Sequence, residues 1–188
     1  MRFIVIEGLD GAGKDTQAYL LRDYLAGRGE KAVLRIHPAQ DNALGRISKK
    51  ALMGGGKARR IVATLFYGLD VIRSVVFYCR DGSTVIFVRY TIACAYLPRP
   101  LIRPAYAVVS RVLPRSEEMF FLDVAPEEAL RRVKARGEAE EMFETLPHME
   151  KARARAMVIA RDWKVIDGNP APEKVFQNLM SGLNGSPK

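Results

Sequence analysis

The chain has 188 residues, of which 48% are apolar and 27% charged, a composition typical of one soluble globular domain. Its two cysteines, Cys79 and Cys94, match neither a disulfide framework nor a metal-binding spacing, which excludes both classes of small stapled domain. The net charge of +9, from 30 basic and 21 acidic residues, indicates attraction to polyanions, either nucleotide phosphates or a nucleic-acid backbone.

The first apolar run, Phe3–Ile6, is predicted to be a short strand. It is too short for the apolar core of a signal sequence or for a membrane span. The longer apolar stretch 64–78 is interrupted by Asp70 and Arg73. We therefore expect a cytoplasmic protein without a membrane partner.

Further apolar runs predict a sheet. Besides Phe3–Ile6, the predicted strands are Ala32–Ile36, Thr84–Val88, Met119–Val124 and Lys164–Ile166. Each is nearly continuously apolar, which is typical of strands covered on both faces. Together they predict one α/β domain over residues 1–188, with a five-stranded parallel sheet and helices on both faces.

Helical patterns separate these strands. After the first strand, one face of a predicted helix carries Ala18, Leu21, Tyr24 and Leu25. Before the third strand, apolar residues recur at helical spacing at Ile61, Val62, Leu65, Phe66, Leu69, Ile72 and Val76. Pro126-Glu127-Glu128 predicts another helix start, because proline and acidic residues are favoured in the first turn.

Two segments show no clear pattern. Residues 94–116 contain Pro98, Pro100, Pro104 and Pro114, which we expect to break any long helix. Residues 131–155 are rich in arginine, lysine and glutamate, with Arg132 and Arg136 spaced one helical turn apart.

The most informative stretch is Gly8-Leu9-Asp10-Gly11-Ala12-Gly13-Lys14-Asp15-Thr16. It lies between a predicted strand and a predicted helix, the context that a phosphate-binding loop requires. Glycines let the backbone close around phosphate oxygens, the helix N-terminus adds positive charge, and Lys14 would reach the terminal phosphates. The predicted ATP-binding residues are Gly8, Gly11, Ala12, Gly13, Lys14, Asp15 and Thr16.

The loop departs from the usual pattern at Asp15. This position normally carries serine or threonine, whose hydroxyl binds Mg²⁺. A carboxylate can also bind Mg²⁺, but it adds negative charge beside the triphosphate. The candidate metal ligands are therefore Asp15 and Thr16, and the alternative is that neither binds the metal.

Over residues 2–182 the chain resembles the thymidylate kinases, nucleoside-monophosphate kinases of the P-loop NTPase fold. The motifs that carry the resemblance are Glu7–Lys14, Leu65-Phe66-Tyr67, Arg89-Tyr90, Phe121–Val124 with Pro126–Leu130, Arg136-Gly137-Glu138 and Val165-Ile166-Asp167. The resemblance implies transfer of the ATP γ-phosphoryl group to dTMP, Mg²⁺ as cofactor, and a homodimer. A nucleic-acid partner is not expected.

The resemblance also implies an acceptor site. Asp10 would bind the sugar hydroxyl, and Phe66 would stack on the base. Arg89, followed by Tyr90, would hold the acceptor phosphate. At Asp70 the family has an arginine that donates to thymine.

The cations that the resemblance implies for catalysis are Lys14, Arg89, Arg132 and Arg136. Arg132 and Arg136 would lie in an arginine-rich lid over residues 131–155 that closes on the transferred phosphoryl group. This role suits the chemistry, because phosphoryl transfer depends on positioning and on neutralising negative charge.

Asp70 suggests a change of acceptor. Phe66 and Asp70 lie one turn apart on a predicted helix, so a base stacked on Phe66 would meet Asp70 at its edge. A carboxylate accepts hydrogen bonds, which favours cytosine or guanine over thymine. The alternative is that Asp70 pairs with Arg73 or another surface arginine and contacts no base.

Other departures affect the metal site and the lid. Val88 stands where the family has an aspartate, and Met142 stands where the lid has an arginine. One hypothesis is that Asp15 supplies the carboxylate missing at Val88, and the alternative is an eroded metal site. These changes leave a second function open, a nucleotide-binding protein of this fold that has lost catalysis.

Overall fold

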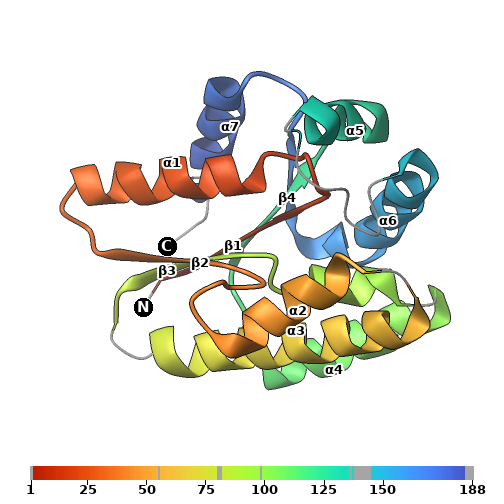
Figure 1. The fold of residues 1–188 in the computed structure, drawn as a ribbon. Coiled ribbons are helices and arrows are strands. Elements are labelled where there is room, and N and C mark those ends of the chain that lie inside the picture. Colours follow the sequence, from red (N-terminus) through yellow and green to blue (C-terminus); the bar gives the residue numbers. More distant parts are fainter. Residues whose placement is uncertain are drawn as a thin grey trace.

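Five strands form one parallel sheet, in the order β2-β3-β1-β4-β5 (Figure 1). The computed structural model describes residues 2–54, 56–79, 82–97, 99–135, 137 and 145–184. The strands are β1 (Phe3–Gly8), β2 (Ala32–Ile36), β3 (Thr84–Val88), β4 (Glu118–Asp123) and β5 (Lys164–Asp167). The predicted parallel sheet is confirmed, and β2 and β3 have the predicted bounds.

Helices cover both faces of this sheet, as predicted. Figure 1 shows α1 (Lys14–Gly27) and α7 (Pro172–Asn184) on one face, with α2 (Ala43–Leu52), α3 (Lys57–Tyr78) and α4 (Arg99–Val112) on the other. Helices α5 (Pro126–Ala135) and α6 (Leu146–Ile159) lie toward β4 and β5. Two short 3₁₀ turns, η1 (Ile92–Tyr96) and η2 (Ala160–Asp162), complete the described elements.

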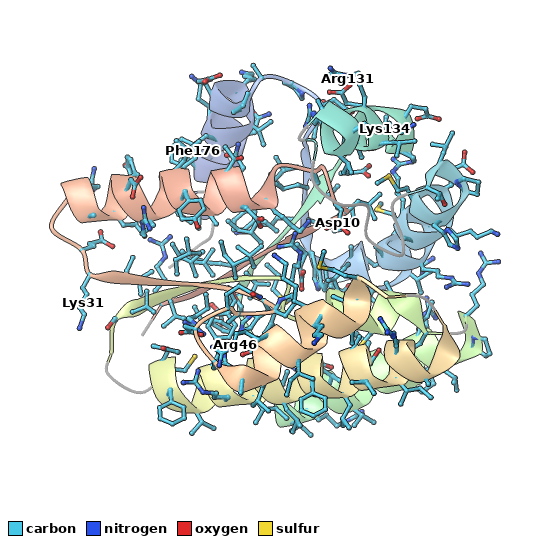
Figure 2. The ribbon with its side chains drawn as sticks, in the orientation of Figure 1. Asp10, Lys31, Arg46, Arg131, Lys134 and Phe176 are labelled. Atoms are coloured by element: carbon cyan, nitrogen blue, oxygen red, sulfur yellow. The ribbon has the colours of Figure 1, made fainter. Side chains whose placement is uncertain are left out.

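The alternation of side chains along β1 explains its continuous apolar sequence. Ile4 and Ile6 face α1 and α7, whereas Phe3 and Val5 face α3, and all four are buried. Helix α7 in turn contacts α1 through an edge-to-face pair of Tyr24 and Phe176, with ring centroids 6.1 Å apart (Figure 2). A strand covered on both faces has no position at which a polar side chain is solvated.

The sheet order places the carboxyl ends of three strands together. β1 lies between β3 and β4, with Ile6 paired to Val88 on one side and to Phe120 on the other. The chain therefore crosses to opposite sides of β1, which creates a crevice beyond the carboxyl ends of the strands. The loop after β1 and the turn after β3 meet at this crevice.

The expectation that prolines prevent a long helix in residues 94–116 is wrong. Helix α4 has 14 residues and contains Pro104. Pro100 is its second residue, where an N–H group would have no intrahelical partner. Pro104 also lies in the first half of the helix, so it removes one early hydrogen bond and leaves the remaining turns intact.

Helix α3 is present where a helix was predicted, but many of its apolar side chains face outward. Ile61, Leu65 and Phe77 are 69%, 58% and 66% exposed. By length and composition alone, residues 61–78 of this helix could also cross a membrane. Core helices of soluble proteins meet the same criterion, but only 22% of residues 61–78 are buried in this helix.

Two adjacent leucines of α1 test how this helix packs on the sheet. Leu21 is fully buried against the sheet, whereas the neighbouring Leu20 is 38% exposed. Leu21→Ala is expected to lower the free energy of unfolding by about 2–5 kcal/mol, because it leaves a cavity in the core. Leu20→Ala, the matched control, should cost less than about 1 kcal/mol. Urea denaturation measures both, and equal losses would contradict the packing of α1.

Candidate active site

The loop between β1 and α1 has the geometry of a phosphate-binding loop. Gly11 has a positive φ of 79°, and a Cβ there would lie 2.3 Å from the carbonyl oxygen of Ala129 in α5. Gly13 precedes α1 with φ 81°, and a Cβ there would meet no atom within 4 Å. The loop is therefore closely packed against α5 on one side and open at Gly13.

Helix α1 begins directly after this loop, at Lys14. The N–H of Gln17 donates to the carbonyl of Gly13 at 3.0 Å, so the first three N–H groups of the helix have no intrahelical acceptor. These groups point along the helix axis and carry its positive partial charge. The predicted context of strand, glycine loop and helix N-terminus is present, and such a terminus is suited to bind an anion.

Four charged side chains converge beside the loop, and we call them the charge cluster: Asp10, Lys14, Asp15 and Arg89. Lys14 donates to the carbonyl of Leu9 at 2.7 Å and lies 3.3 Å from Asp10 Oδ1. Arg89 donates to Asp15 Oδ1 at 3.0 Å and to Asp10 Oδ1 at 3.3 Å. Figure 2 shows Asp10 in the loop between β1 and α1. The cluster unites residues that the sequence assigned to the ATP, acceptor and metal sites.

The electrostatics of the charge cluster follow from this pairing. Burial, and then the nearby Arg89, lower the pKa of Lys14. Burial alone would raise the pKa of Asp10, but Lys14 and Arg89 together hold it below its ordinary value. Burial opposes the charge on Arg89 as well, yet Asp10 and Asp15 raise its pKa. The cluster thus contains two cations and two anions that neutralise each other.

Arg89 reaches the cluster because the backbone turns sharply after β3. Its φ is +59°, a conformation that non-glycine residues rarely adopt. The hydroxyl of Tyr67 in α3 donates to the Arg89 carbonyl, and the Arg89 N–H contacts the carbonyl of Ile6 at 3.4 Å. Such a conformation persists only where its surroundings hold it in place.

Glu7 provides the strongest of these constraints. One carboxylate oxygen, Oε1, accepts the backbone N–H groups of Tyr90, Thr91 and Ile92 at 2.9, 2.7 and 3.1 Å. The side chain is fully buried, and none of the described residues donates to its other oxygen. Burial raises the pKa of Glu7 to about 7, although the three N–H donors oppose this shift. Glu7 therefore fixes the three residues that follow Arg89.

Sequence reasoning assigned no role to Glu7. It is the one charged residue in the otherwise apolar strand β1, which is buried on both faces. A carboxylate at such a position requires hydrogen-bond donors, and this requirement is the signal that could have identified it. The donors themselves, three consecutive backbone N–H groups, carry no sequence signature.

The side chain of Tyr90 lies in the core, which does not fit its predicted role in binding the acceptor. Its ring is buried against Phe3 and Phe87, with centroids 5.2 and 5.4 Å away. Its hydroxyl donates to the carbonyl of Pro114 at 2.9 Å. Tyr90 is a core residue, and only its backbone N–H takes part in holding the turn.

The predicted role of Asp70 also requires correction. Asp70 is fully buried, and its two oxygens accept the N–H of Ala39 and the side-chain amide of Asn42, both at 2.7 Å. Neither oxygen bonds to Arg73 in the described part of the chain, and both instead tie α3 to the loop after β2. The helical spacing from Phe66 was read correctly, but the spacing could not reveal that the β2–α2 loop covers Asp70.

Arg132 forms hydrogen bonds with its own helix and with the β5–α7 loop. Its guanidinium donates to Glu128 at 2.7 Å and to the carbonyls of Gly168 and Asn169 at 2.9 and 2.8 Å. Arg132 therefore holds the β5–α7 loop in this state, and its catalytic role stays a prediction. Arg136 and Met142 lie outside the described residues.

Other predicted positions remain compatible with their roles. Phe66 is half-buried on α3, and Thr16 is exposed in the first turn of α1. Val88 is fully buried among core side chains, so it offers nothing to a metal. Arg131 and Lys134 are exposed on α5, and Figure 2 shows Arg131 on the outer side of this helix.

The residues present could hold Mg²⁺ with nucleotide. Asp15 and Asp10 supply carboxylates and Thr16 a hydroxyl, all at the start of α1 or in the loop before it. The part of the chain that the structure describes contains no cluster of three metal-binding side chains. Mg²⁺ does not need one, because it is commonly bound by one or two carboxylates, substrate phosphates and water.

One cavity lies away from the charge cluster. It has a volume of about 640 Å³ between α5 and α6, and its lining includes Glu127, Glu150, Arg153 and Asn169. Arg153 forms a bidentate pair with Asp123, at 2.6 and 2.7 Å. Its one arginine is therefore already paired, and the cavity is less suited to phosphate than the loop.

Glu7 makes stability depend on pH in a defined direction. Its pKa is about 7 in the folded chain and near 4.5 when exposed, so between these values the folded state binds more protons than the unfolded state. Stability should therefore fall as pH rises from about 4.5 to 7, by on the order of 3 kcal/mol.

Glu7→Gln should remove this fall in stability with pH, because the glutamine side chain accepts the same N–H groups without titrating. Urea denaturation of both proteins at pH 5 and pH 8 measures the difference. Burial lowers the pKa of His37 to about 4, so this residue makes stability rise with pH instead of fall. His37 is present in both proteins, so its effect cancels in the comparison. The same pH dependence in both proteins would contradict the charge state assigned to Glu7.

Comparison with known proteins agrees with this geometry. The sequence model of the family described as thymidylate kinase matches residues 6–179. A probable thymidylate kinase of Pyrobaculum calidifontis is 32% identical over 91% of this chain and 90% of its own length. A thymidylate kinase of Carboxydothermus hydrogenoformans is 28% identical over 98% of both chains, and a probable one of Pyrococcus abyssi is 26% identical over 95% of this chain and 94% of its own length. The chain belongs to the thymidylate kinase family.

Proposed function

We propose that this protein is an ATP-dependent nucleoside-monophosphate kinase that transfers the γ-phosphoryl group of ATP to dTMP. The observation that carries this proposal is the convergence of Lys14 and Arg89 beside the glycine loop. One cation comes from the donor loop and the other from the turn after β3, so a donor and an acceptor phosphate could meet between them.

The protein's contribution to this reaction is positioning and charge. The N–H groups at the start of α1 and the Lys14 ammonium would hold the donor phosphates. Arg89 would hold the acceptor phosphate, with its backbone fixed by Glu7 and Tyr67. Bound Mg²⁺ would neutralise charge on the phosphate oxygens, and Asp15 is placed to bind it.

The surroundings of Asp70 favour dTMP as the acceptor. Preference for another base would require the Asp70 carboxylate to meet the base edge, but its two oxygens bond to Ala39 and Asn42. Its carboxylate therefore no longer opposes thymine. Phe66 on α3 remains the aromatic residue proposed to stack on the base.

A coupled ADP-release assay with Mg²⁺-ATP and a panel of monophosphates tests this function. The panel contains dTMP, dUMP, UMP, CMP, dCMP, GMP and AMP, and dTMP should give the highest kcat/KM. Lys14→Met should lower kcat at least about 100-fold, because it removes a cation from the phosphates. Lys49→Met, on the exposed side of α2, is the control for loss of one lysine and should leave kcat unchanged.

Two results would contradict parts of this proposal. Preference for CMP or GMP would move the specificity to residues other than Asp70. Absence of turnover with every monophosphate, together with measurable ATP binding, would favour the alternative of a nucleotide-binding protein that has lost catalysis.

We also propose that the protein is a cytoplasmic homodimer that associates through α3. The exposed apolar face of this helix includes Ile61, Leu65, Leu69, Ile72 and Val76. A contiguous face of this kind on a soluble protein indicates a binding surface. A second copy fits it better than lipid, because Asp70 and Ser74 of the same helix are buried against the domain and Asp70 bonds to the β2–α2 loop.

Leu65→Glu tests the dimer by placing a charge in the centre of the proposed interface. Light scattering after size-exclusion chromatography should give twice the 21.0 kDa chain mass for the wild type and the chain mass for the variant. Val112→Glu, at a 71% exposed apolar position of α4, should leave the dimer intact. A monomeric wild type, or one that sediments with phosphatidylcholine vesicles, would contradict the proposal.

A further inference from the structure

The bond between Asp15 and Arg89 has a consequence for acceptor binding, which rests on the proposed function. Where a phosphate-binding loop usually has serine or threonine, this chain has a carboxylate, and that carboxylate bonds to Arg89 at 3.0 Å. Arg89 is also the side chain proposed to hold the acceptor phosphate. In the empty site its guanidinium is therefore occupied by Asp15 and Asp10.

The two acids differ in how they are held. Asp10 contacts both Lys14 and Arg89, and its side chain is 22% exposed. Asp15 pairs with Arg89 and, among the described residues, with no other cation of the cluster, and its side chain is 40% exposed. Asp15 also lies in the first turn of α1, at the position whose hydroxyl usually binds the metal. Asp15 is therefore the acid that can leave Arg89 at least cost.

We propose that Asp15 is a latch that keeps Arg89 from the acceptor phosphate in the empty site, and that a divalent cation bound with the nucleotide releases it. The latch makes the cluster neutral, whereas a serine would leave it with a net positive charge. A cation near Asp15 competes with Arg89 for the same carboxylate oxygen. Its arrival would free the guanidinium, so binding of Mg²⁺-nucleotide would strengthen binding of the acceptor.

Coupling of this kind is reciprocal and can be measured without catalysis. Calorimetric titration of dTMP in EDTA, without nucleotide, should show that Asp15→Ser binds dTMP about five- to tenfold more tightly than the wild type. With Mg²⁺-ADP present, the two proteins should differ by less than about twofold. The wild type should therefore gain dTMP affinity from Mg²⁺-ADP, and the variant should gain much less.

Asp23→Ser is the matched control for the change of charge. Asp23 is an exposed acid on the same helix and pairs with its neighbour Arg22, away from the cluster. This variant should bind dTMP as the wild type does. Equal tightening by both variants would indicate a general charge effect, and no tightening by Asp15→Ser would overturn the latch.

A measurement without ligand separates the latch from the proposed function. If neither protein binds dTMP under any condition, the acceptor assignment fails, and the latch is judged from thermal unfolding of Asp15→Ser, Arg89→Gln and the double variant. A latch predicts that the double variant loses less melting temperature than the two single losses together. Additive losses would show that the two side chains do not interact, and would contradict the latch.

Discussion

The hydrogen bonds of the buried Glu7 carboxylate determine where Arg89 can lie. Glu7 is the second-last residue of an apolar strand at the centre of the sheet and accepts three consecutive N–H groups from the turn after β3. This turn contains Arg89 in a rarely adopted backbone conformation. Without these bonds the turn could relax, and Arg89 would no longer be directed at the glycine loop.

The turn fixed by Glu7 also explains why the four residues of the neutral charge cluster lie together. Because β1 and β3 are neighbours in the sheet, the turn that Glu7 fixes lies directly beside the loop that follows β1. Lys14 and Arg89 therefore approach each other; Asp10 contacts both, and Asp15 pairs with Arg89, so the two acids balance the two cations. A site that must admit several phosphates thus starts without excess positive charge. Binding must rearrange these pairs, which gives Asp15 its proposed part in the order of binding.

Much of the fold could be predicted from the sequence. Strands β1 and β3 are buried along their whole length and are nearly continuous apolar runs, because helices cover both faces. The glycine loop is identified by its residues together with its place between strand and helix. Pro104 was misleading because its cost depends on where it falls in the helix, which the sequence alone does not give.

The candidate site could be predicted only in part. The structure brings the predicted residues Lys14, Asp15 and Arg89 together, since each belongs to a motif with a local geometry, and their binding roles stay predictions. The burial of Tyr90 and Asp70 depends on contacts with Pro114 and the β2–α2 loop, which are distant in sequence. The same reason hid Glu7, whose donors are backbone groups. Helix α3 shows a different limit of the sequence. Its apolar pattern indicates a face that is covered, but the pattern does not identify the surface that covers it.

The most direct test of this account is a crystal structure of the complex with Mg²⁺-ADP and dTMP. The account predicts that Arg89 has left Asp15 and contacts the dTMP phosphate, while Glu7 still accepts the N–H groups of Tyr90, Thr91 and Ile92. Lys14 should have moved from the Leu9 carbonyl to the ADP phosphates. A complex in which Arg89 remains bonded to Asp15 while other residues hold the acceptor phosphate would contradict it.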